Sequence, residues 1–595
     1  MKPRRASASQ SMLNGAMILT ISMALVKVIG FFYKMPLNNI FLMEGRGVFN
    51  SAFNLYSPVY AIAITGLPIA VARMVSERVA LGKFRDVREI QKVAHRLFLF
   101  VGVAGLLVLL ALAYPYAVFY CTRGVLALPA ILAIAPAIFF CCAMSIYRGY
   151  YEGLRNMIPT AVSQVLEALC KLILGIFLAS LCMRLGAAEY KRSGTVFGQS
   201  AASEAAANSL LYPWAAAASI IGITLGTVVG LVYLVLRHKI RGDGITREQL
   251  VNSAPAEPRK KLRHEMITIA IPMVLSSVVL NLTNLIDTTN VQRILINLVA
   301  NHSDVIERIY ADAFRLAGTE KDGQASYISG IYGAMLDFRT LIPTIVTALG
   351  VSALPAISAA WALKDKGSVQ RTINSVIRIS LMISLPAGFG MAVLYREIPM
   401  LFFEKSNPGM TEHAAPILLM FALSTALMSV SAPITNLLQG IGRTDVPVKS
   451  LLVGAVVKIA SNFILVGNPE INILGAPIGS ILCYVAIVTI NLGVLLKVSR
   501  VKLHLTTVLW KPLFCSGISA AAAWAAKGLM QLFAAKAGVD GRLLQLLVMA
   551  AAIGAAVLVY AISMLLTHAV TEEDLEMLPK GKKIGKTLAK YGLLG

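Results

Sequence analysis

Basic side chains occur inside segments that are otherwise apolar, and their spacing suggests a site for an anion. Lys27 and Lys34 are seven residues apart in the first apolar segment. Positions seven apart on an α-helix almost superimpose in azimuth and lie about 10 Å apart along the axis, so the two ammonium groups would form one basic stripe. Gly30, between them, would allow another helix to approach closely. Such a stripe would attract a phosphate group electrostatically.

Later apolar segments also contain polar and charged residues, which a lipid-facing surface does not tolerate. A charge at the bilayer centre costs at least about 2.5–3.5 kcal/mol, so such residues usually face a protein or water-filled interior. The candidate substrate-binding residues are Lys27, Lys34, Asn54, Lys171, Asn284, Asp287, Arg293, Asp337, Arg339 and Lys458. Cations outnumber carboxylates in this set, which favours an anionic substrate.

Some of these residues have a structural interpretation as well. Lys34 would reach the outer membrane interface if its side chain extended away from the bilayer centre. Glu167 and Lys171 are four residues apart and would form an ion pair on one face of a helix. Asn54 is placed to contact sugar hydroxyls together with Tyr56, although tyrosine is also common at membrane interfaces.

The seventh apolar segment has a polar stripe that allows two interpretations. Asn284 and Asp287 belong to it and would contact either a substrate or ion, or a neighbouring helix through hydrogen bonds. Arg293 lies nearer the outer surface. In the next segment, Asp337 and Arg339 are two residues apart, so they point about 200° apart in azimuth and cannot both face one cavity.

The composition is that of a membrane protein and excludes several other classes. Of the 595 residues, 57% are hydrophobic and only 14% charged, whereas soluble domains have about a quarter charged residues. The net charge of +24 belongs to scattered loops and forms no aromatic-interleaved basic patch, so we expect no nucleic-acid partner. The cysteines and histidines lack metal-ligand spacing, and no P-loop, HExxH or GxSxG motif is present. We therefore predict neither an enzyme nor a bound cofactor or metal.

The elements that must position these residues are membrane-spanning helices. About fourteen apolar windows are long enough to cross the hydrocarbon layer. They begin near Leu13, Val48, Leu97, Leu126, Ile158, Tyr212, Met266, Ile328, Ile373, Ala414, Val448, Leu474, Pro512 and Leu544. Proline and glycine within several windows, such as Pro58, Gly66 and Pro68, predict kinked helices. Lys and Arg concentrate in alternate loops, which predicts that both the N- and the C-terminus are cytoplasmic and that the first helix is retained.

A weak internal repeat suggests that the bundle has two halves. Gly153 precedes Lys171 by eighteen residues, as Gly440 precedes Lys458, and both pairs occupy the junction of the fourth and fifth spans of a half. An offset of six spans, being even, gives both halves the same topology. The predicted divisions are an N-terminal lobe (1–236), a basic cytoplasmic linker (237–265), a C-terminal lobe (266–498), an extra helix pair (499–567) and a basic cytoplasmic tail (568–595).

Short motifs make the chain resemble a known superfamily. They are Val26-Lys27-Val-Ile-Gly30-Phe, Gly66-Leu-Pro68, Tyr332-Gly and Leu-Gln439-Gly440-Ile-Gly-Arg443-Thr. With their order over the predicted spans, the chain resembles the multidrug/oligosaccharidyl-lipid/polysaccharide (MOP) flippases, in particular the polysaccharide biosynthesis and stage V sporulation protein B branch, related to bacterial lipid II flippases. The resemblance covers essentially the whole chain.

The resemblance implies an all-α polytopic membrane protein, with two six-helix lobes and two C-terminal helices around a central cavity. In lipid II flippases, cations of the first helix face the cavity and attract a pyrophosphate head group. Lys27 matches the first such position, and Lys34 matches the second with a shift of one residue. An arginine of the second helix completes that set in the family. Here the second span offers only Arg73 and Arg46, near its two ends.

The function expected from these observations is a flippase in the bacterial cell membrane. Its expected substrate is an undecaprenyl-pyrophosphate-linked cell-wall precursor, with lipid II as the first choice. Another lipid-linked polysaccharide, such as a teichoic acid or capsule intermediate, is the alternative, followed by a cation-coupled drug exporter and a scaffold without transport activity. The membrane potential or a gradient of Na⁺ or H⁺ would drive alternating access. The expected partners are the lipid-linked oligosaccharide pyrophosphate, membrane lipids and cell-wall synthesis enzymes, and the expected state is a monomer.

Overall fold

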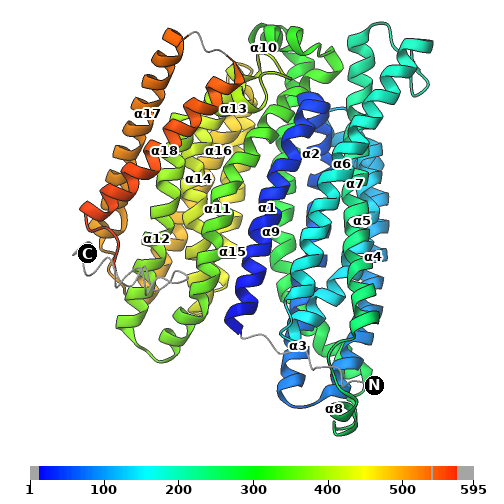
Figure 1. The fold of residues 1–595 in the computed structure, drawn as a ribbon, viewed down its shortest axis with the longest axis vertical. Coiled ribbons are helices and arrows are strands. Elements are labelled where there is room, and N and C mark those ends of the chain that lie inside the picture. Colours follow the sequence, from blue (N-terminus) through cyan, green and yellow to red (C-terminus); the bar gives the residue numbers. More distant parts are fainter. Residues whose placement is uncertain (1–11, 538–540, 572–595) are drawn as a thin grey trace. The chain divides into compact units, whose positions relative to one another are not determined.

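The protein is built almost entirely from long helices (Figure 1). The computed structural model describes residues 12–537 and 541–571. The basic segment before residue 12 and the part of the predicted cytoplasmic tail from residue 572 lie outside the described residues. The helices group into two compact units, Met1–Gly330 and Ile331–Gly595, with the boundary inside one long helix. The predicted lobe boundary at residues 265 and 266 stays a prediction.

The first unit contains ten α-helices and the start of an eleventh. Their bounds are α1 (Met12–Ile40), α2 (Leu42–Ala61), α3 (Leu67–Ala80), α4 (Phe84–Tyr120), α5 (Leu128–Gly153), α6 (Ile158–Ser193), α7 (Glu204–Arg241), α8 (Arg247–Val251), α9 (Arg259–Asn301), α10 (Ser303–Ala317) and α11 (Gln324–Ala362). A small antiparallel hairpin, β1 (Thr195–Val196) and β2 (Gln199–Ser200), joins α6 to α7.

The second unit takes the remainder of α11 and the helices that follow it. These are α12 (Lys366–Val393), α13 (Glu397–Phe402), α14 (Met410–Gly440), α15 (Asp445–Ser461), α16 (Gly475–Ser499), α17 (Lys511–Ala537) and α18 (Arg542–Leu566). The extra helix pair predicted at the C-terminus corresponds to α17 and α18, which pack on each other. An ion pair between Lys527 of α17 and Glu397 of α13, with 2.6 Å between Nζ and Oε1, fixes α17 within this unit.

Eleven helices in the described part of the chain are long and apolar enough to cross a membrane. The predicted spans that begin near Leu13, Met266 and Ile328 fall in α1, α9 and α11, which are long helices outside that set. The all-helical membrane fold is therefore confirmed, whereas the number of fourteen spans stays a prediction.

The kink expected in the second span takes the form of a short π-helix. Residues Ile62–Gly66 form this element between α2 and α3, just before Pro68, whose missing N–H interrupts the regular helical ladder. Gly66 lies against α9, because a side chain there would meet the backbone nitrogen of Val274 at 2.8 Å. The bend thus coincides with a close approach of two helices.

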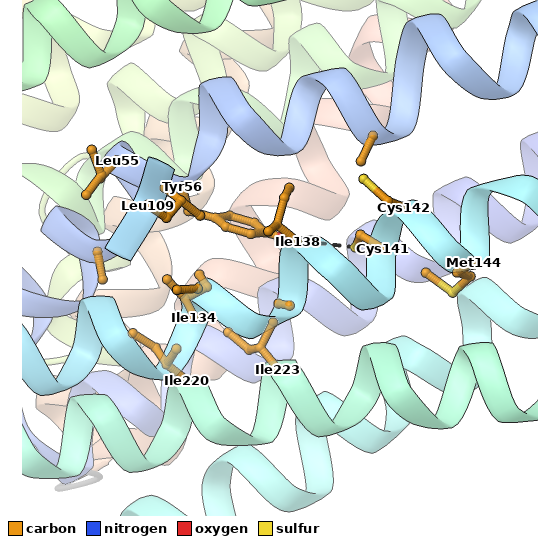
Figure 2. Packing of buried hydrophobic residues seen from close by; sticks show 14 of the residues in the cluster. Leu55, Tyr56, Leu109, Ile134, Ile138, Cys141, Cys142, Met144, Ile220 and Ile223 are labelled. Carbon is orange, nitrogen blue, oxygen red and sulfur yellow. Dashed lines mark hydrogen bonds between the residues drawn. The ribbon is translucent and has the colours of Figure 1, made fainter. Parts of the chain in front are cut away.

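The apolar core of the first unit lies between α2, α4, α5 and α7. Figure 2 shows Tyr56 of α2 reaching toward Cys141 of α5, while Leu109, Ile138 and Ile223 fill the space around them. The Tyr56 hydroxyl and Cys141 Sγ are 3.7 Å apart. Tyr56 is 4% exposed, so it belongs to this core, and the prediction that it contacts sugar hydroxyls is wrong.

The segment between α7 and α9 docks onto the loop that joins α3 to α4. Buried Arg78, at the end of α3, donates to Glu265 in the first turns of α9 at 2.8 Å and lies 3.6 Å from Glu257, which precedes α9. A hydrogen bond from Lys261 lowers the pKa of Glu257, and nearby cations act in the same direction. The predicted basic linker is therefore attached to the bundle through its acidic residues.

The structure also aligns the two copies of the predicted repeat at the level of helices. In the first unit α5 ends at Gly153, and Lys171 follows the first residue of α6 by thirteen positions. In the second unit α14 ends at Gly440, and Lys458 follows the first residue of α15 by thirteen positions. Each unit thus presents a lysine at the same place along the equivalent helix.

Candidate functional site

Two helices of the first unit, α1 and α6, carry the basic residues of the candidate site. Ser22 of α1 donates to Gln164 of α6 across an offset of 142 positions. Tyr33 contacts Gly175 with the same offset, so the two helices run side by side in the same direction. This register places Lys171 level with residue 29 of α1, which lies between Lys27 and Lys34 along the helix axis.

The three lysines of α1 and α6 form one electropositive cluster, which we call the lysine cluster (Lys27, Lys34 and Lys171). Both lysines of α1 are near enough to Lys171 to repel its charge. Lys27 is exposed, whereas Lys34 and Lys171 are half-buried. Like charges brought together by a fold are unfavourable unless an anion joins them, so this cluster is suited to bind phosphate.

The aromatic ring of Tyr33 packs against the ammonium group of Lys171. This ring lies 5.5 Å from the Lys171 Nζ in a cation–π contact, and the Tyr33 hydroxyl donates to the Ser219 carbonyl of α7 at 3.1 Å. Gly175 makes room for the ring, because a Cβ there would lie 2.6 Å from Tyr33 Cε2. Gly30 meets nothing within 4 Å, so the prediction that it mediates close helix packing is wrong, and Gly175 serves that purpose instead.

Helix α7 supports the back of α6 through glycines. A Cβ at Gly222 would lie 2.5 Å from the Cα of Gly175, and one at Gly226 would lie 2.8 Å from the Glu167 carbonyl oxygen. The two backbones therefore touch directly behind Lys171. This contact fixes the height and the direction from which the lysine leaves α6.

Glu167 pairs with a residue that the sequence did not single out. Its carboxylate accepts from Arg148 of α5 at 2.9 Å, and Arg148 Nε also donates to Ser163 at 3.0 Å. Within the described residues, the ammonium group of Lys171 takes part in no hydrogen bond or ion pair. The expected ion pair between Glu167 and Lys171 is therefore wrong, because Arg148 is the salt-bridge partner of Glu167.

Two polar residues of α9 form hydrogen bonds to α2. Ser57 of α2 donates to Asn281 at 2.7 Å, and Gln292 donates to Ser51 of α2 at 2.9 Å. Asp287 is buried at 7% exposure, whereas Asn284 is exposed. These two contacts are hydrogen bonds between helices, as one interpretation of the stripe predicts. Asn284 is exposed, and its role in substrate binding stays a prediction.

Two other candidates of the first unit lie apart from these contacts. Arg293 is exposed and donates to the Phe119 carbonyl at the end of α4, at 3.1 Å. This contact makes it an anchor between α9 and α4. Asn54 is half-buried on α2, and its role in substrate binding stays a prediction.

The second unit holds Asp337, Arg339 and Lys458. Arg339 is 8% exposed, and its guanidinium carbon lies 4.9 Å above the ring of Phe421 in α14. Asp337 and Lys458 are half-buried. Arg339 is thus the member of the Asp337–Arg339 pair that points into the packing between α11 and α14, and a role for any of the three in substrate binding stays a prediction.

No metal centre is evident among the residues that the structure describes. In that part of the chain, no three histidine, cysteine or carboxylate side chains are grouped closely enough to hold a metal ion. The ammonium groups of the lysine cluster can attract an anion electrostatically and donate hydrogen bonds to it. The ammonium group of Lys171 also contacts the ring of Tyr33.

Comparisons with known proteins agree with the fold. A family model described as "Polysaccharide biosynthesis protein" matches residues 12–361, which is more than half of the chain. A second model, described as "Lipid II flippase MurJ", matches residues 313–549. Together, the two models cover almost all predicted spans.

Two curated proteins of Bacillus subtilis (strain 168) align over most of their length. The lipid II flippase MurJ is 24% identical over 80% of this chain and 81% of its own, and the stage V sporulation protein B is 22% identical over 84% and 86%. A solved structure of the lipid II flippase MurJ in an inward closed conformation matches with a TM-score of 0.56 and 14% identity, over 93% of this chain and 99% of that one. An inward-facing MATE transporter of the MOP superfamily matches with a TM-score of 0.57, 14% identity, and coverage of 80% and 99%. At these identities the solved structures establish a shared fold.

Proposed function

The chain belongs to the polysaccharide biosynthesis protein family of the MOP superfamily, and we propose that it carries a polyprenyl-pyrophosphate-linked cell-wall precursor, lipid II in the first place, from the inner to the outer leaflet. The observation that supports this proposal is the lysine cluster. A pyrophosphate diester bears two negative charges, and ammonium groups on two parallel helices match that charge distribution.

The head group of such a lipid is too polar to cross hydrocarbon without a hydrated path. Lys27, exposed on α1, makes the first contact with the pyrophosphate, while Lys171 and Lys34 hold it at mid-depth. Because no nucleotide-binding motif is present, the driving force is the membrane potential or an ion gradient, worth about 2.3 kcal/mol per charge for each 100 mV. The two units would alternate between openings toward the two leaflets.

The direct test is the accessibility of the lipid II head group at the outer leaflet of a cell in which this protein is the only flippase. We expect Lys27→Gln and Lys171→Gln to abolish or greatly reduce accessibility, with Lys34→Gln giving a smaller effect. Lys239→Gln, which removes an exposed lysine at the end of α7, is the matched control. Normal accessibility in all three cluster variants would refute the proposal.

A second lipid-linked glycan remains a candidate because the relatives include a stage V sporulation protein as well as a lipid II flippase. The lysine cluster recognises the pyrophosphate, which these substrates share, and leaves the glycan unspecified. Reconstituted vesicles loaded with labelled lipid II or with a labelled teichoic acid precursor separate the two possibilities. Movement of the second lipid alone would assign the protein to the other pathway.

A further inference from the structure

We infer that Arg148 is a positioning residue of the candidate site, whose role is to keep Glu167 away from Lys171 so that Lys171 remains available to a pyrophosphate. This inference rests on the proposed function for the identity of the anion. It assigns a role to an arginine that does not belong to the lysine cluster.

Glu167 has two cations within reach, and only one of them is its partner. A glutamate four residues before a lysine on a helix is the favourable order for an ion pair, so local geometry alone favours Lys171. Lys171 is also near enough to feel the attraction of the carboxylate. The salt bridge nevertheless joins Glu167 to Arg148, with 2.9 Å between Nη2 and Oε2.

The guanidinium group of Arg148 is the favoured partner because a second hydrogen bond already holds it in place. Ser163, one turn before Glu167 on α6, accepts from Arg148 Nε at 3.0 Å. The Ser163 hydroxyl itself donates to the Thr160 carbonyl at 2.8 Å, which orients its acceptor side toward Arg148. A planar guanidinium group fixed in this way loses little freedom when it binds the carboxylate, whereas the lysine chain would have to be immobilised.

The charges of Arg148, Glu167 and Lys171 show how the salt bridge affects anion binding. Arg148 and Glu167 neutralise each other, so Glu167 does not neutralise Lys171. If Arg148 were absent, Glu167 would turn to Lys171, and the carboxylate would then repel the phosphate as well. The same residue pair that joins α5 to α6 thereby determines the affinity for the anion.

The second unit offers an internal comparison. Lys458 matches Lys171 in the predicted repeat, and the positions that match Glu167 and Arg148 are Gly454 and Thr435. The carboxylate and the arginine are therefore absent together. The arginine thus occurs in the unit that has a carboxylate able to pair with the lysine, and it is missing in the unit without that carboxylate. The inference predicts this pattern.

The first experiment measures the reactivity of Lys171 toward an acetylating reagent, by mass spectrometry of the purified full chain without substrate. An ion pair protects an ammonium group from losing its proton, so reactivity reports pairing. We expect Arg148→Gln to lower the reactivity of Lys171 by about tenfold or more, as one charged hydrogen bond would. Arg148→Gln combined with Glu167→Gln should restore it, and Lys239 is the control lysine in all samples. An unchanged reactivity in Arg148→Gln overturns the inference.

The second experiment measures binding of undecaprenyl pyrophosphate to the same variants by native mass spectrometry. Arg148→Gln should bind about tenfold or more weakly, Glu167→Gln as well as the unaltered protein, and the double variant close to it. A purely structural ion pair would make both single variants equally harmful, which would also overturn the inference. If the reactivities follow expectation but the unaltered protein does not bind this lipid, the role of Arg148 stands and the proposed function fails.

Discussion

Replacing Gly222 by alanine should force α6 and α7 apart at the point where their backbones touch. The added Cβ would lie 2.5 Å from the Cα of Gly175 and 2.9 Å from the carbonyl carbon of Leu174. Carbon atoms pack at about 3.5–4.0 Å, so the helices must separate by roughly 1 Å. Because the atoms that block the methyl group belong to the backbone, no side chain can turn away to accommodate it.

The size of the effect follows from two opposing contributions. Overpacking a core position costs about 1–3 kcal/mol, and values near the upper end apply where backbone must move. Alanine is the better helix former by about 1 kcal/mol, which offsets part of this cost. We therefore expect a net loss of about 1–2 kcal/mol in the free energy of unfolding, together with a displacement of Lys171 from the Tyr33 ring.

Thermal unfolding of the purified protein in detergent measures the first effect, and undecaprenyl pyrophosphate binding measures the second. Gly30→Ala is the matched control, because a Cβ there meets nothing within 4 Å and should leave the melting temperature unchanged or slightly raised. A melting temperature of Gly222→Ala equal to or above that of the unaltered protein would refute the reasoning about helix contact.

Three further changes test other parts of the structure. Lys527→Met leaves the buried Glu397 carboxylate unpaired and should cost about 3–5 kcal/mol of stability, part of which returns when Glu397→Gln is added; thermal unfolding measures both. Glu257 has a lowered pKa, so its contribution to linker docking is present above the usual glutamate pKa and is lost as the pH falls through the lowered value. Hydrogen-exchange protection of residues 243–258, corrected for intrinsic rates, should therefore decrease on acidification, and Glu257→Gln should remove this dependence. Arg293→Gln should retain head-group accessibility, because this arginine binds a backbone carbonyl at the end of α4; a loss as large as that of Lys171→Gln would contradict its role as an anchor.

The membrane fold was predictable from the sequence because apolar length and charge-poor windows leave few alternatives to a helix in lipid. The stripe of Lys27 and Lys34 followed from helix periodicity alone. The membership of Lys171 in the same cluster required the offset between α1 and α6, which two tertiary contacts determine. Helix periodicity within one segment contains no information about that offset.

The errors at the site have a common physical origin. The partner of Glu167 depends on the position of Arg148 in the preceding helix, whereas sequence spacing reveals only the neighbour at Lys171. Similarly, the sequence shows that Gly30 lies between two lysines, but the contact between helices is at Gly175, which faces Tyr33. Each of these choices depends on which faces of two helices meet. The sequence does contain a signal for the role of Arg148. This arginine lies near the end of the apolar helix α5, and the next helix, α6, has a polar face with which it can pair.

The register of α1 and α6 has a consequence for how the protein is made. Helix α1 leaves the ribosome before α6 and α7, and the residues that bond to Ser22 and Tyr33 follow 142 and 186 positions later. At about 5–20 residues per second, this interval lasts roughly 10–40 s. During that time the lysines of α1 lie in or beside the bilayer without the helix that completes their site. Helix α1 is therefore synthesised well before the helices on which it packs, and the lysine cluster is complete only after α6 has joined it.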